Sequence, residues 1–136
     1  MKTPWAIAVL VGLGGFAGTL ARYGLGMASQ HLSVGWPLGT LVSNVLGCFV
    51  IGIVTGLSAR NGTISPEVRL VLATGFCGGF TTLSALMDET AAMLRASEYG
   101  HATLYIAGSL VVSMSACILG LMAARALTQS GGGIGS

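Results

Sequence analysis

Several polar side chains that could bind an ion stand inside long apolar stretches of this sequence. Asn44 lies about eight residues into one such stretch, which places it about 10 Å along a helix that rises about 1.5 Å per residue. Its amide could donate a hydrogen bond to a passing anion, or it could join two helices. Tyr105 and Ser109 are four residues apart and share one face of a helix. Tyr105 could instead belong to an aromatic belt at the membrane surface.

A glycine cluster, GFCGG at Gly75–Gly79, is followed by the hydroxyl side chains of Thr81, Thr82 and Ser84. Glycines at this density favour a break in a helix. Carbonyl groups freed by a break at membrane depth must be buried in protein or line a cavity, where they can ligate a bare cation. The alternative is a continuous helix that packs tightly through its glycine face.

Charged residues are rare in this sequence, so the position of each one calls for a structural or functional explanation. Arg22 lies about 17 residues beyond Trp5, hence about 26 Å along a helix and close to the far interface. It could snorkel to that interface, or gather anions in a vestibule. Asp88 and Glu89 are expected in or near the headgroups. The sequence holds no nucleophile–base set, phosphate loop or metal-ligand cluster, so we expect no enzyme.

The elements that position these residues are four apolar stretches. Charged residues are 7% and hydrophobic residues 53% of the 136 residues, against roughly 25% charged residues in soluble proteins. A crossing needs about 20 mostly apolar residues. We therefore predict an all-α membrane protein with four transmembrane helices, as a multi-pass protein of the inner (plasma) membrane. The expected helices cover residues 5–27, 36–59, 68–94 and 102–127.

The four stretches form a single domain over residues 1–127, and residues 128–136 read as a disordered glycine-rich tail. The link between the second and third stretches contains the turn signals Asn61-Gly62 and Ser65-Pro66. A net charge of +2 without a basic stripe argues against nucleic-acid binding. Cys48, Cys77 and Cys117 all lie in apolar stretches and are an odd number, which argues against a disulfide framework.

Small residues recur at the four-residue spacing that lets membrane helices pack closely. The pairs are Gly14/Gly18, Gly35/Gly39, Gly52/Gly56, Gly75/Gly79 and Ala116/Gly120. Four spans seldom enclose a polar pathway alone, so we expect at least a homodimer. The Lys and Arg residues divide four against two between the two sides of the membrane, a bias small enough for insertion in either orientation.

Taken together, these segments resemble the Fluc or CrcB family of small fluoride channels. The matching stretches are GGFAGTLARYGLG (14–26), WPLGTLVSNVLGCFVIG (36–52), GFCGGFTTLSALMDE (75–89) and LYIAGS (104–109). The resemblance implies an antiparallel, dual-topology homodimer whose third helix is broken mid-membrane. It also implies fluoride pores and a central structural sodium ion at the dimer interface. The function so implied is passive, fluoride-selective efflux that lowers cytoplasmic fluoride and confers fluoride resistance.

The resemblance also implies roles for particular residues. The backbone carbonyls of Gly78 and Thr81 match the sodium ligands. Asn44 and Thr40 match pore residues, Arg22 the vestibule arginine, and Glu89 the acid that ends the third-helix motif. The remaining pore positions are Thr82, Ser84, Leu83, Leu86, Tyr105 and Ser109.

The sequence departs from the family pattern at one motif. The usual TTFSTF reads TTLSAL here, so Leu83 and Leu86 replace two phenylalanines whose positive ring edges face fluoride. Either the hydroxyls and Asn44 suffice, or the chain conducts weakly or not at all and pairs with a second, Phe-bearing subunit. A small multidrug exporter is a further alternative, but it needs a carboxylate in the first span, and residues 5–27 contain none.

Overall fold

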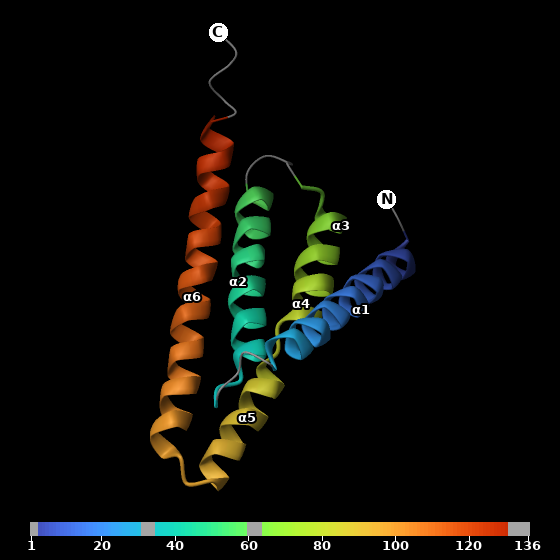
Figure 1. Ribbon diagram of the computed structural model, residues 1–136. Coiled ribbons are helices and arrows are strands. Elements are labelled where there is room, and N and C mark those ends of the chain that lie inside the picture. Colours follow the sequence, from blue (N-terminus) through green and yellow to red (C-terminus); the bar gives the residue numbers. More distant parts are fainter. Residues whose placement is uncertain (1–2, 31–34, 60–63, 131–136) are drawn as a thin grey trace.

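The computed structural model describes residues 3–30, 35–59 and 64–130, and every regular element within these ranges is a helix. Four segments are long and apolar enough to cross a membrane (Figure 1): Pro4–Ser29, Leu38–Ser58, Pro66–Arg95 and Tyr99–Gln129. The predicted all-α, four-span architecture is therefore confirmed. Lys2, Arg60, the expected turn at Asn61-Gly62 and residues 131–136 lie outside the described residues.

The first, second and fourth spans are single helices, and the third is composite. The single helices are α1 (Pro4–Ser29), α2 (Leu38–Ser58) and α6 (Tyr99–Ser130). The third span consists of α3 (Pro66–Arg69), the π-helical segment η1 (Leu70–Cys77), α4 (Gly78–Phe80) and α5 (Leu83–Arg95). Helix α6 continues to Ser130, into the segment expected as a tail.

Capping residues begin two of these elements. Ser65, which we read as part of a turn, caps α3: its hydroxyl accepts a hydrogen bond from the Val68 N–H at 3.3 Å, and Pro66 occupies the first turn, where its missing N–H costs nothing. Thr82 caps α5 in the same way, accepting from the Ala85 N–H at 3.2 Å. The third span thus restarts as a new helix at Leu83.

The glycine cluster stays helical, and the extended residues come after it. Thr81 (φ −86°, ψ 154°) and Thr82 (φ −151°, ψ 117°) separate α4 from α5. The glycines serve close packing against α1: a Cβ on Gly75 would lie 2.7 Å from the Val11 carbonyl oxygen, and one on Gly79 would overlap the Gly15 carbonyl oxygen. The interruption therefore lies two residues beyond the cluster.

The other small residues also bring helices together, with one exception. Gly18 faces the Phe76 backbone of η1, while Gly52 and Gly120 bring α2 and α6, which lie side by side in Figure 1, into backbone contact. Gly35 is the exception, and its assignment to a packing pair is wrong. It precedes α2, has φ +83° and would meet no atom within 4 Å through a Cβ. Glycine suits this position because it adopts a positive φ without steric cost.

The small interior of the described chain contains polar groups beside apolar ones such as Phe80 and Leu86, and many large apolar side chains lie on its exterior. Ser43, Asn44, Thr90 and Ser109 are buried, whereas large apolar side chains along α1 and α6 are exposed. This arrangement suits a lipid surrounding, where apolar side chains face hydrocarbon and polar groups must find partners inside. The candidate site lies around the buried polar groups.

Candidate functional site

Asn44 clamps the extended backbone of Thr82. Its Nδ2 donates to the Thr82 carbonyl at 3.1 Å, and its Oδ1 accepts from the Thr82 N–H at 2.7 Å. Asn44 lies on α2 and is only 9% exposed. Its side chain satisfies the N–H and the carbonyl of Thr82, neither of which makes a helical hydrogen bond. It therefore joins two helices, which was one of the two roles open to it. One of the two Nδ2 hydrogens remains available to a ligand.

This clamp changes which carbonyl groups are free. In a continuous α-helix the N–H of residue i bonds the carbonyl of residue i−4, so Gly78 would accept from Thr82 and Thr81 from Ala85. Here the Thr82 N–H donates to Asn44, and the Ala85 N–H donates to the Thr82 hydroxyl. The Gly78 and Thr81 carbonyls both lose their helical donors to side chains.

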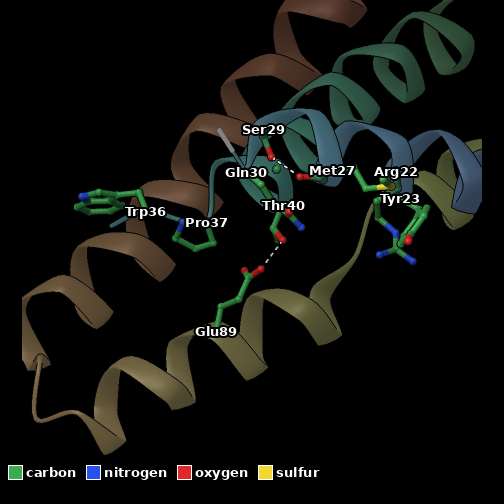
Figure 2. Close-up of a pocket in the computed structure, with 11 residues that line it drawn as sticks. Arg22, Tyr23, Met27, Ser29, Gln30, Trp36, Pro37, Thr40 and Glu89 are labelled. Carbon is green, nitrogen blue, oxygen red and sulfur yellow. Dashed lines mark hydrogen bonds between the residues drawn. The ribbon is translucent and has the colours of Figure 1, made fainter. Parts of the chain in front are cut away.

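Arg22 donates a hydrogen bond to another backbone carbonyl of the third span. Its Nε donates to the Gly79 carbonyl at 3.3 Å, across 57 residues of sequence. It also borders a cavity of about 510 Å³ between α1, α2 and α5. Figure 2 shows Arg22 at one end of this cavity and Trp36 at the other, with Thr40 and Glu89 between them. Its positive charge therefore faces a hollow, as a vestibule arginine would.

Glu89 joins three helices through its carboxylate. Oε1 accepts from the Thr40 hydroxyl at 2.6 Å, the bond drawn in Figure 2, and Oε2 accepts from the Tyr105 hydroxyl at 2.7 Å. Glu89 is half-buried and Tyr105 is 2% exposed, so the Tyr105 side chain points into the protein and not outward as a belt residue would. The two hydroxyl bonds compensate for placing a carboxylate among the helices.

A second, smaller cavity of about 190 Å³ lies beside the clamp. Its lining includes Asn44, Cys48, Thr81, Thr82, Leu83, Leu86, Ser109, Leu110 and Ser113. Ser109 is 3% exposed, and its hydroxyl oxygen has no hydrogen-bond partner among the described residues. The leucines differ: Leu86 is 2% exposed, whereas Leu83 is 64% exposed. Ser84 is exposed and lies 3.1 Å from the Thr82 hydroxyl.

Comparison with known proteins identifies the family. Residues 9–121 match the family described as CrcB-like protein, Camphor Resistance (CrcB). The chain belongs to the CrcB family. It is 46% identical over 125 residues to the fluoride-specific ion channel FluC of Prosthecochloris aestuarii, covering 92% of this chain and 98% of the relative.

Two further relatives of this CrcB-family chain carry the same name. FluC of Chlorobium phaeobacteroides (strain BS1) is 43% identical over 125 residues, covering 92% of this chain and 98% of the relative. FluC of Rhizobium etli is 46% identical over 121 residues, covering 88% and 97%. The resemblance found in the four sequence stretches is confirmed, and the match extends over nearly the whole chain.

Most residues predicted from the sequence as site residues of this CrcB-family chain lie around the two cavities described above. Arg22, Thr40 and Glu89 line the larger one, with Tyr105 bonded to Glu89. Asn44, Thr81, Thr82, Leu83, Leu86 and Ser109 line the smaller one. Cys48 and Ser113 were missed, although each lies four residues beyond a predicted position, Asn44 and Ser109 respectively. That spacing was the available signal.

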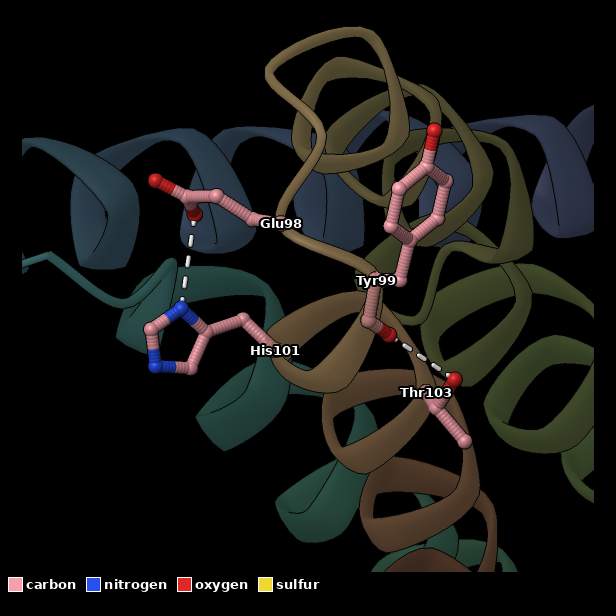
Figure 3. A network of polar contacts seen from close by, with 4 residues as sticks. All are labelled: Glu98, Tyr99, His101 and Thr103. Carbon is pink, nitrogen blue, oxygen red and sulfur yellow. Dashed lines mark hydrogen bonds and ion pairs between the residues drawn. The ribbon is translucent and has the colours of Figure 1, made fainter.

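A third polar cluster lies at the start of α6, where the His101 ring packs edge-on against Trp36 of the larger cavity. His101 Nδ1 lies 3.5 Å from Glu98 Oε2, and the Thr103 hydroxyl donates to the Tyr99 carbonyl at 2.9 Å. Figure 3 draws both contacts. The His101 and Glu98 side chains are mostly exposed. Over the described residues no group of three or more His, Cys, Asp or Glu side chains could hold a metal ion.

Proposed function

We propose that this CrcB-family protein is a fluoride-selective channel that lets fluoride leave the cell passively. The observation that supports this proposal is that the chain belongs to the family, whose relatives at 43–46% identity are named fluoride-specific ion channels. The protein spans the inner (plasma) membrane several times, and it is not an enzyme. Hydrogen fluoride crosses membranes as a neutral molecule and ionises inside, so an anion leak driven by the membrane potential expels fluoride without energy coupling.

The chemistry of the smaller cavity supports this proposal. Fluoride is strongly hydrated, so a pore must replace its water with hydrogen-bond donors in a narrow bore. The free Nδ2 hydrogen of Asn44 and the unpartnered Ser109 hydroxyl are such donors. The Thr82 and Ser84 hydroxyls add a polar edge. Arg22, at the larger cavity, would raise the local concentration of anions.

The proposal includes an antiparallel, dual-topology homodimer and a third helix broken mid-membrane at Thr81–Thr82. Leu83 borders the smaller cavity and is nevertheless 64% exposed, so one chain supplies only part of a pore wall. A second copy in the opposite orientation would supply the rest and bring the two interrupted helices together. The few charges of the chain suit insertion in both orientations.

A structural sodium ion at the centre of that dimer is also part of the proposal, held by the carbonyls of Gly78 and Thr81. These residues fit the ion because both carbonyls have lost their helical donors, as the hydrogen bonds of Thr82 and Ala85 record. Unwound backbone carbonyls are known sodium ligands in membrane proteins. The ion would supply the positive charge that holds such oxygens together.

Exchanging sodium for N-methylglucamine throughout purification should lower the temperature at which the protein unfolds. A ligand that binds only the folded state stabilises it by an amount that rises with the logarithm of the ligand concentration above Kd, and the large organic cation cannot enter a carbonyl cage. The measurement is thermal unfolding in detergent micelles along a sodium titration at constant ionic strength, with potassium as the matched control. If the unfolding temperature does not change with sodium concentration, the ion has no place in the proposal.

The alternative is a weakly conducting or silent subunit that pairs with a second, Phe-bearing chain. The observation that favours it is the pair of leucines at the smaller cavity, where Leu83 and Leu86 offer no positive ring edge to an anion. Fold and family are the same under both readings. They differ in whether the chain conducts alone.

Purified protein reconstituted alone into liposomes should release trapped fluoride faster than empty vesicles. Vesicles are loaded with potassium fluoride, valinomycin carries the balancing potassium, and a fluoride electrode follows release. Vesicles loaded with potassium chloride are the selectivity control and should retain their anion. Fluoride release no faster than that of empty vesicles would overturn the homodimeric channel.

The variant carrying both Leu83→Phe and Leu86→Phe separates the two readings in the same assay. If the wild-type chain is silent and the double variant conducts, the chain requires a Phe-bearing partner. If both conduct, the leucines suffice.

A further inference from the structure

Another hollow lies between the last turns of α2 and α6, which run side by side in Figure 1. Glycine brings the two helices together here, since a Cβ on Gly56 would lie 2.6 Å from the Ala124 Cβ. The hollow is a groove of about 340 Å³, and its lining includes Thr55, Gly56, Ala59, Leu121, Arg125 and Gln129. None of these residues lines either cavity of the candidate site, so the proposed pore leaves this groove unused.

Arg125 brings an unpaired positive charge to the groove. Its side chain is exposed, and none of the described residues bonds or pairs with its guanidinium. Gln129 lies four residues further along α6 and therefore on the same face, and Thr55 adds a hydroxyl group from α2. The described lining residues include no acidic side chain. A positive charge and several hydrogen-bond donors without a carboxylate favour an anion as the ligand.

The position of Arg125 along α6 places this charge near the membrane surface. The fourth span, Tyr99–Gln129, has 31 residues, which make about 46 Å of helix at about 1.5 Å per residue. The hydrocarbon core of a bilayer is about 30 Å thick, so the ends of this helix extend into the headgroups. Arg125 lies one turn before Gln129, at the depth of the lipid phosphates.

Apolar side chains continue from the groove toward the centre of the membrane. Ile118 and Met122 precede Arg125 by seven and three residues, so all three share one face of α6. Ile118 is 50% exposed and Met122 is 58% exposed. An acyl chain can cover this face when the phosphate of its lipid lies at Arg125, whereas inorganic phosphate cannot. The face therefore matches a phospholipid, which is charged at one end and apolar along its length.

We infer that this groove binds an anionic phospholipid of the phosphatidylglycerol class. Arg125 donates to the phosphate oxygens, Thr55 and Gln129 bond the headgroup, and an acyl chain covers Ile118 and Met122. A zwitterionic lipid fits less well, because the described lining offers no carboxylate to pair with its ammonium group. The bound lipid contacts both α2 and α6, so it stabilises the folded state. This inference concerns binding and is independent of whether the chain conducts fluoride.

Thermal unfolding of the full chain in detergent micelles, at constant sodium concentration, tests the inference. Dioctanoyl phosphatidylglycerol should raise the unfolding temperature, whereas dioctanoyl phosphatidylcholine and inorganic phosphate at the same concentration should not. Arg125→Gln should bind phosphatidylglycerol about tenfold more weakly, or worse, because it loses a hydrogen bond to a charged group. Arg95→Gln is the matched control and should keep the lipid effect, since Arg95 is exposed in the last turn of α5, which precedes the opposite end of α6.

Three results of this titration would overturn the inference. The first is an equal rise in unfolding temperature for the wild type and Arg125→Gln. The second is an equal rise with phosphatidylcholine, which would show that any phospholipid suffices. The third is an equal rise with inorganic phosphate, which would show a site for free anions and not for a lipid.

Native mass spectrometry gives a readout that does not depend on stability. From an equimolar mixture, the wild-type protein should retain phosphatidylglycerol in preference to phosphatidylcholine. Arg125→Lys keeps the positive charge and should keep this preference, whereas Arg125→Gln should lose it. A preference that persists in Arg125→Gln would refute the site. Its loss in Arg125→Lys would refute the selection of the lipid by charge.

Discussion

Replacing Asn44 by alanine should abolish fluoride release. The substitution removes both bonds to Thr82 and leaves the N–H and the carbonyl of that residue without partners inside the protein. Each unsatisfied buried group costs about 1–3 kcal/mol, and about 1.4 kcal/mol is a tenfold change in an equilibrium constant. Together the two losses correspond to a change of about 30-fold or more in the equilibrium constant between the intact and the disrupted site. The liposome assay measures it.

Ser43→Ala is the matched control for this variant. Ser43 is the preceding residue on α2 and is fully buried, but its hydroxyl donates to the Thr40 carbonyl of its own helix. Its loss should leave fluoride release close to that of the wild type. Asn44→Asp is informative as well, because it keeps the acceptor for the Thr82 N–H, loses the donor to the Thr82 carbonyl and adds a buried charge. Normal release by Asn44→Ala would show that the clamp is dispensable.

Gly18→Ala should destabilise the fold severely. A Cβ at this position would overlap the Phe76 carbonyl oxygen and lie 2.9 Å from the Phe80 nitrogen. Because these are backbone atoms, they cannot move aside as a side chain can. Overpacking typically lowers the free energy of unfolding by about 1–3 kcal/mol and occasionally by more. Because this substitution pushes α1 away from the third span, we expect a loss at or above the upper end of that range. Thermal unfolding in micelles reports the loss.

Gly24→Ala tests whether the effect is local. Gly24 lies on the same helix, but a Cβ there would meet no atom within 4 Å. Alanine favours a helix over glycine by about 1 kcal/mol, so this variant should be as stable as the wild type or slightly more stable. Equal destabilisation by both substitutions would mean that general helix effects, and not contact with Phe76, limit this position.

Much of the fold could be predicted from the sequence because its signals are local. A run of apolar residues long enough to cross a bilayer needs no knowledge of its neighbours. Glycines at four-residue spacing indicate close packing in the same way, although Gly35 shows that spacing alone cannot tell a packing glycine from one that supplies a positive φ. The candidate residues came from their polar character inside apolar runs and from the family motifs that carry them.

The sequence by itself determined that four apolar helices would surround a small set of polar groups, including Asn44, Glu89 and Ser109. Only the tertiary structure decided which groups meet. Asn44 and Thr82 are 38 residues apart, and Thr40 and Glu89 are 49 apart, so their pairing depends on how the helices pack. The same holds for the interruption. The glycine cluster remained helical against α1, and the chain became extended at Thr82, where an amide from another helix satisfies both backbone groups that the helix gave up.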